Sequence, residues 1–323
     1  MSPPSRPSLH PRPMSLFSRC LSLPVLLPLL LAGPLLQAPA ARGHGADGGE
    51  SWPAPGEFRA RGVLTLEGHA GLENNFEGQP RHYAIDGTVG TVLEWGLGGG
   101  GVLGIDLDIG PALVWGEAEH FYGRVEMEEE DEEGGHGPHG GAGSNWRRSD
   151  IKGRVQVRYQ PNPRLQLSAQ WLPHFITATQ VEDVAGLRNE LVFSGTLALG
   201  PGDVNFALGD GLETIVDGLY VSADHHEGWE STGTYLGSYT DTRVGVGFQL
   251  DLMNVTLEAG PRFYRPGNYA GLDQRVDWGG ELELTLPIRR GLVWFAHWEP
   301  VYSNQVGATG WVNHIGTGLT LRF

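Results

Sequence analysis

The sequence predicts an all-β fold: a transmembrane barrel of up-and-down antiparallel β-strands, about 12 of them. Three observations lead to this prediction. Segments of alternating apolar and polar residues recur from Glu57 onward, short and long connections alternate between them, and aromatic residues gather near both ends of the segments. Each observation is typical of strands that face lipid on one side and a polar interior on the other.

The alternation is clearest between 150 and 160, where odd positions are apolar or glycine and even positions are charged or amide residues. This period of two places the two sets on opposite faces of a strand. The strands expected on this basis lie at 57–70, 82–95, 101–115, 150–160, 164–174, 187–199, 202–210, 241–251, 253–264, 275–287, 291–301 and 311–323.

The connections between these segments alternate in length, as they do between the periplasmic turns and outer loops of a membrane barrel. The short ones lie at 97–100, 161–163, 200–202, around Leu252 and at 289–290. The long ones lie at 71–81, 116–149, 175–186, 211–240, 265–274 and 302–310. An even number of strands places both chain ends on the short-turn side, which is expected to be the periplasmic side.

Aromatic residues on the apolar parity form two groups, as expected for girdles at the two membrane interfaces. At the long-loop end the group is Trp115, Trp171, Phe263, Trp278, Trp298 and Trp311. At the short-turn end it is Phe58, Trp95, Tyr159 and Phe323.

Residues 1–40 are expected to be a cleaved signal peptide. Arginines precede an apolar stretch at 21–33, and the small residues of 38–40 fit a cleavage site. A membrane anchor is the alternative, but the apolar run falls short of ~20 residues and contains prolines. We expect 41–56 to form a Gly/Pro-rich periplasmic tether and 57–323 to form the barrel.

Charge and cysteine content exclude several functions. The formal net charge is −16, and without residues 1–40 it becomes −19, because 19 basic and 38 acidic residues remain. Such a chain repels nucleic acid and attracts cations. The single cysteine, Cys20, lies in the expected signal peptide, so neither disulfides nor thiol chemistry are expected in the mature chain.

The last segment, Trp311–Phe323, carries apolar residues on one parity and ends in phenylalanine. Together with the signal peptide and the alternating strands, it resembles bacterial outer-membrane β-barrel proteins, porin-like ones among them. The resemblance covers about 57–323 at the level of architecture. It implies a location in a Gram-negative outer membrane, contact with lipid and lipopolysaccharide, and recognition of the C-terminal strand by the barrel-assembly machinery.

The inward parity of the expected strands carries charges of both signs. These lumen charges include Arg59, Arg61, Arg154, Arg158, Arg243, Arg262, Glu190, Glu258, Glu281 and Glu283. They would line a polar channel, or they would pair with one another and help to plug a non-conducting interior. Twelve strands leave a lumen wider than that of an eight-stranded barrel and narrower than that of a large porin.

Four histidines share the inward parity on strands that become neighbours when the barrel closes. We expect His297 to lie opposite His314 and His69 opposite His82, with Glu67 and Glu299 on the same face; the pairs depend on hairpins that fold symmetrically about their loops. Imidazole and carboxylate groups ~5 Å apart on neighbouring strands can bind Zn²⁺, Cu²⁺ or Ni²⁺. A rim of solvated or hydrogen-bonded histidines is the alternative, and no cofactor is required.

The expected outer loop at 116–149 is of low complexity. Seven of the eight residues from Glu126 to Glu133 are acidic, and His136 and His139 follow in a Gly-rich stretch. The loop would gather divalent cations weakly, or it would serve as a solvated segment that binds Ca²⁺ and lipopolysaccharide phosphates.

We therefore expect an outer-membrane channel for small hydrophilic solutes that favours divalent transition-metal cations. A non-conducting surface anchor, which meets a partner through 116–149 and 211–240, is the alternative. An enzyme is not expected, because the chain lacks the nucleophile and base arrangement of an embedded hydrolase.

Overall fold

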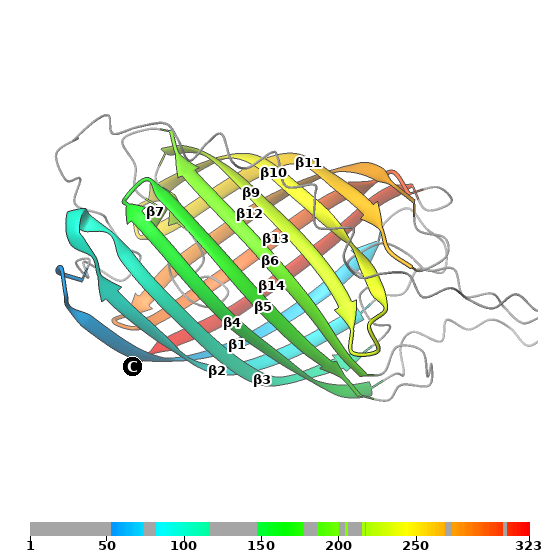
Figure 1. Cartoon of the computed structure of the whole chain (residues 1–323), viewed down its shortest axis with the longest axis horizontal. Helices are drawn as coiled ribbons and strands as arrows, with labels where there is room; N and C mark the ends of the chain where they lie inside the picture. Colours follow the sequence, from blue (N-terminus) through cyan, green and yellow to red (C-terminus); the bar gives the residue numbers. More distant parts are fainter. Residues whose placement is uncertain are drawn as a thin grey trace, which may run out of the picture. The chain divides into compact units, whose positions relative to one another are not determined.

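In a computed structural model, the chain forms a closed barrel of antiparallel strands (Figure 1). The structure describes residues 53–73, 82–115, 147–177, 186–199, 204–205, 215–216, 218–268, 273–305 and 309–323. The expected signal peptide, most of the tether, and His136 and His139 lie outside the described residues. Within the described part, there is no helix of sufficient length and hydropathy to cross a bilayer.

Twelve strands close the barrel, as the sequence predicts. They are β1 (Phe58–Glu73), β2 (His82–Gly96), β3 (Val102–Trp115), β4 (Arg147–Asn162), β5 (Leu165–Ile176), β6 (Gly186–Ala198), β9 (Gly218–Glu230), β10 (Tyr235–Leu250), β11 (Met253–Pro266), β12 (Arg275–Arg289), β13 (Leu292–Ser303) and β14 (Gly310–Arg322). β14 pairs with β1, and the backbone of Phe323 exchanges two hydrogen bonds with Gly62. We call the end of the barrel at Phe58 and Phe323 the terminal end, and the opposite end the distal end.

The seventh barrel strand differs from the prediction. The described part of the segment 202–210 is not a strand of the barrel sheet: β7 (Val204–Asn205) pairs with β8 (Ile215–Val216) in a separate two-stranded sheet. The strand that pairs with β6 is β9, which the sequence prediction had placed inside an outer loop. Val204, Phe206 and Leu208 give the right period, but the segment is short and glycine-rich, whereas β9 is long enough to cross the membrane.

The predicted long outer loop at 211–240 is therefore wrong. β9 and β10 are joined at the distal end by a four-residue connection, 231–234. The connection between β6 and β9, 199–217, is longer than the short turn at 200–202 that had been expected there. The expected loop at 116–149 is also slightly shorter, because β4 begins at Arg147.

The outward faces of the strands are apolar, and the predicted aromatic groups lie on them. The most exposed are Phe58, Trp171, Phe263, Trp278, Trp298, Trp311, Tyr159 and Phe323. Because so many large apolar side chains are exposed on the outer face of the barrel, this face suits contact with lipid. The buried groups lie on the inward parity instead and are largely polar.

Four prolines interrupt the hydrogen-bonded ladders on the outward parity: Pro111, Pro173, Pro261 and Pro300. Beside each of them, two successive register pairs are missing from one neighbouring strand. Proline has no amide hydrogen to donate, so it breaks a ladder locally. Two of these prolines follow a glycine, Gly110 and Gly260, at which the neighbouring backbone comes very close.

Candidate functional site in the barrel interior

A cavity of about 350 Å³ lies inside the barrel. Its lining comes from β4, β5, β6 and β9 to β13, and consists mainly of charged, amide and hydroxyl side chains. Alternation along each strand places these groups inward, since their sequence neighbours face the outer surface. The interior is thus a polar compartment enclosed by an apolar outer wall.

The cavity lining carries more acid than base. Its carboxylates are Asp224, Asp241, Glu258, Glu281, Glu283 and Glu299, whereas its guanidinium groups are Arg154, Arg243 and Arg262. A cleft lined by one sign of charge raises the local concentration of the opposite ion. The lining therefore favours cations over anions.

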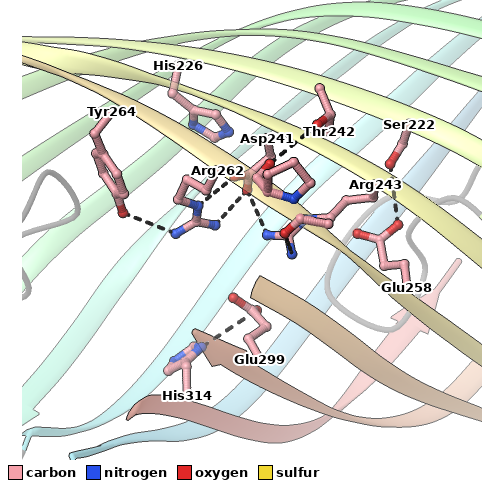
Figure 2. Close-up of polar contacts among 12 residues, drawn as sticks. Ser222, His226, Asp241, Thr242, Arg243, Glu258, Arg262, Tyr264, Glu299 and His314 are labelled. Carbon is pink, nitrogen blue, oxygen red and sulfur yellow. Dashed lines mark hydrogen bonds and ion pairs between the residues drawn. The ribbon is translucent and has the colours of Figure 1, made fainter. Parts of the chain in front are cut away.

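The two arginines of β10 and β11 are held by one acid, as Figure 2 shows. Asp241 accepts hydrogen bonds from Arg262 Nε and Nη2, both at 2.6 Å, and from Arg243 Nη2 at 3.0 Å. The Arg262 guanidinium also lies 4.7 Å from the centroid of the Tyr239 ring. These contacts hold both guanidinium groups against the wall. Because Asp241 neutralises part of their charge, the two arginines attract an anion in the cavity less strongly.

Acidic side chains meet on the neighbouring wall. Glu258 of β11 lies directly opposite Glu281 of β12 in the strand register, and Glu283 lies two residues further along β12. Tyr220 donates a hydrogen bond of 2.9 Å to Glu258. Ser222 donates another of 3.3 Å to the same carboxylate, which Figure 2 shows. Like charges directly opposite each other on a sheet repel. A cation near these carboxylates relieves that repulsion.

The wall formed by β2 to β4 is different, because its charges pair with one another. Arg158 Nε lies 2.5 Å from Asp106 Oδ2, and its Nη2 lies 3.2 Å from Glu94. Arg154 pairs with Asp108 at 3.0 Å. These pairs are part of the neutralised interior that the sequence leaves as an alternative, as are the pairs of Asp241 with Arg243 and Arg262 on β10 and β11.

A group of histidines gathers near the distal end, where β1, β13 and β14 adjoin. We call His69, His297, His314 and Glu299 the histidine cluster. The His314 ring centroid lies 5.1 Å from that of His69 and 5.3 Å from that of His297. His314 Nε2 and His69 Nδ1 are 3.1 Å apart, and His314 Nδ1 lies 3.7 Å from Glu299 Oε1.

The register that brings these side chains together is shifted by two residues from the predicted one. His297 lies opposite Gly316, and His314 lies opposite Glu299. On the other hairpin, His69 lies opposite Ala84, and His82 lies opposite Gly71. Each hairpin is centred one residue further along the chain than expected, which shifts the pairing by two and keeps every side chain on its face.

The other residues of the predicted metal site are not part of the histidine cluster. Glu67 Oε1 lies 3.6 Å from His297 Nε2, so this acid adjoins the cluster. Only the backbone of His82 is described. His136 and His139 belong to a part of the chain that the structure does not describe, and their role remains a prediction.

Comparison with known proteins shows which barrels this fold is similar to. Residues 202–323 match the profile of a family described as a cyanophage outer membrane protein-like β-barrel domain. A solved outer-membrane channel from Pseudomonas putida F1 has the same fold, with a TM-score of 0.51, 9% identity, and coverage of 85% of this chain and 97% of that one. The chain therefore has the fold of outer-membrane β-barrel proteins.

Other similarities of this barrel are weaker. The translocator domain of the autotransporter NalP from Neisseria meningitidis aligns with a TM-score of 0.44 and 13% identity, over 82% of this chain and 88% of that one. No curated protein matches the sequence.

Most of the predicted lumen charges do face the interior of the barrel. Six of them line the cavity: Arg154, Arg243, Arg262, Glu258, Glu281 and Glu283. Arg158 is buried beside it, and Glu190 forms a hydrogen bond with His226, which lines it. Arg59 and Arg61 lie nearer the terminal end, where they pair with Glu57 and Glu94.

Glu57 precedes β1, so it lies outside the membrane-spanning strands. Hydrogen bonds from the Arg59 side chain and from the Ala54 amide lower the pKa of its carboxyl group.

Sequence reasoning missed the contribution of β9 to the lumen of the barrel. Asp224 and His226 line the cavity, although they had been placed in an outer loop. The signal was present, because Tyr220, Ser222, Asp224 and His226 alternate with Leu219, Val221 and Ala223. His225 and Glu227 then interrupt the apolar parity, which hides the strand.

Proposed function

We propose that the protein is a channel for small hydrophilic solutes, and that it favours cations, divalent transition-metal ions among them. The observation that supports this proposal is the acid-rich cavity inside a closed barrel. Water and ions are stable in such a compartment because its walls offer charged and hydrogen-bonding groups, while the apolar outer face holds the barrel in lipid.

The size of the interior supports small solutes. A twelve-stranded barrel is wider than a side-chain-filled eight-stranded one and narrower than the large porins. The cavity of about 350 Å³ would accommodate hydrated ions and small polar molecules. The similar fold from Pseudomonas putida F1 is itself an outer-membrane channel, which agrees with the proposal.

The proposal includes an orientation and a route of assembly. Both ends of the barrel-forming chain lie at the terminal end, which would face the periplasm after removal of a signal peptide. β14 would be the strand that the assembly machinery binds, because Phe323 continues its outward parity and is 74% exposed. The distal connections would then meet lipopolysaccharide at the cell surface.

Adjacent residues of β5 provide a matched test of conduction. Ser168 lines the cavity, whereas Ala169 faces the outer surface. We expect Ser168→Trp to lower single-channel conductance severalfold in a planar bilayer, because the indole group would occupy the lumen. Ala169→Trp adds the same side chain on the lipid face and should leave the conductance unchanged.

Two outcomes would contradict the proposal. If the folded wild-type protein inserts without producing current steps, the interior is plugged, and the barrel serves as an anchor or binding module. If the two tryptophan variants alter the current equally, the current does not pass through the cavity.

A further inference from the structure

Four side chains form a continuous row across β2, β1, β14 and β13: Asp86, His69, His314 and Glu299. Asp86 Oδ2 lies 3.3 Å from His69 Nε2, and His69 Nδ1 lies 3.1 Å from His314 Nε2. The last contact joins His314 Nδ1 to Glu299 Oε1 at 3.7 Å (Figure 2). The row thus begins and ends with a carboxylate, and both nitrogens of each imidazole are used.

If both imidazoles are neutral, one of the three contacts in this row lacks a proton. Each of its three contacts joins two atoms that repel unless a proton or a cation lies between them, because ionised carboxylates only accept hydrogen bonds. Two neutral imidazoles would supply two protons for three contacts, and a protonated His314 would supply the third. Asp86 stays ionised beside Lys152 Nζ at 2.5 Å, so it does not supply the third.

The distances indicate which of the three contacts would lack a proton. The contacts at 3.3 and 3.1 Å are hydrogen-bond lengths, so the two protons belong on His69 Nε2 and His314 Nε2. His314 Nδ1 then presents a lone pair to Glu299. Their separation of 3.7 Å is longer than a hydrogen bond. Two ligands of one tetrahedral Zn²⁺ ion, bound at 2.0–2.2 Å, stand roughly 3.3–3.5 Å apart.

We propose that a divalent transition-metal ion binds between Glu299, His314 and His297 on the lumen wall. Each of these residues offers one ligand atom, and the three atoms lie within 4.8 Å of one another. Coordination at 2.0–2.2 Å would require these side chains to move closer to a common point. Two imidazoles and one carboxylate suit Zn²⁺, Ni²⁺ or Cu²⁺ better than Mg²⁺ or Ca²⁺, which prefer oxygen ligands alone.

The surroundings support each ligand. His314 donates its other ring N–H to His69, which in turn donates to Asp86; such outer partners orient metal-bound histidines and raise their basicity. Gly316 makes room for the third ligand, because a Cβ at this position would collide with the His297 ring and lie 2.5 Å from Glu67 Oε1. Glu299 also lines the cavity and is 41% exposed, so an ion in the lumen can reach it.

The site is tested by calorimetric titration of the folded full-length protein in detergent with ZnCl₂, and by the visible absorption of bound Co²⁺. We expect one lumen site whose affinity falls at least tenfold in Glu299→Gln and in His314→Gln. His174→Gln is the matched control, because His174 also faces the lumen and lies 3.1 Å from a carboxylate, that of Asp150. It should keep the wild-type affinity.

A further variant, Gly316→Ala, retains every ligand but crowds His297, and it should weaken Zn²⁺ binding without removing a donor. Folding of each variant is checked by heat-dependent gel mobility. If Glu299→Gln and His314→Gln bind Zn²⁺ as the wild type does, a proton holds the His314–Glu299 contact and the metal site is wrong.

This inference rests on the proposed channel only in placing the ion on a transport path, and the two can fail separately. Zn²⁺ binding without current would contradict the channel and leave the site intact. Current without Glu299-dependent Zn²⁺ binding would contradict the metal site and leave the channel intact.

Discussion

Replacing Arg158 with methionine is expected to lower the free energy of unfolding by about 3–5 kcal/mol, because it leaves a buried carboxylate without its counter-ion. The Arg158 side chain is 2% exposed and that of Asp106 is fully buried. Two hydrogen bonds join them, at 2.5 and 3.0 Å. Denaturant titration in detergent or lipid vesicles measures the loss.

Arg154 of the same strand is the matched control for this prediction. It pairs with Asp108 at 3.0 Å, but its side chain is 23% exposed, so water compensates part of the loss. Arg154→Met should therefore cost less than half as much. Adding Asp106→Asn to Arg158→Met removes the unpaired charge and should restore part of the stability. Equal losses in the two arginine variants would show that burial of the Arg158 pair is unimportant.

Alanine at Gly110 or Gly260 is expected to destabilise the barrel by about 1–3 kcal/mol or more, because the added methyl group has no space. At Gly110 a Cβ would collide with the carbonyl oxygen of Gly87 on β2, and at Gly260 with that of Thr242 on β10. Neither glycine has a positive φ, so space rather than backbone conformation requires glycine.

Gly68 is the matched control, since a Cβ there has no heavy atom within 4 Å. Alanine in place of a strand glycine restricts the unfolded chain, so Gly68→Ala should be neutral or stabilising by roughly 0.5–1 kcal/mol. The yield of heat-modifiable folded barrel and the denaturation midpoint report both effects. If the three variants behave alike, the close strand approach at Gly110 and Gly260 does not constrain the fold.

Period-two alternation was sufficient to predict the barrel, its strand number and the faces of most strands. It failed at β9, because His225 and Glu227 occupy outward positions near the distal end, where a strand leaves the apolar layer and polar side chains are tolerated. The stretch 202–210 has the right period but is not the strand that pairs with β6. The local alternation of residues does not show which of two candidate segments pairs with β6.

The histidine cluster was predictable in its face but not in its register. Parity alone places His69, His297 and His314 on the interior, and closure of the barrel makes β14 the neighbour of both β1 and β13. To assign which residues lie opposite each other, the centre of each hairpin must be known, and this centre depends on the backbone conformation of the connection. The row that joins Asp86 to Glu299 spans four strands, and it emerges only when all three registers are known.

The most direct test of the proposed function is the reversal potential across a bilayer that holds the wild-type protein in a KCl gradient. We expect the potential to show a permeability for K⁺ above that for Cl⁻, because acids outnumber arginines in the cavity lining. The triple variant Glu258→Gln, Glu281→Gln and Glu283→Gln keeps side-chain size and should bring the ratio close to one. Absence of current, a preference for Cl⁻, or an unchanged ratio in the triple variant would contradict a cation-favouring channel.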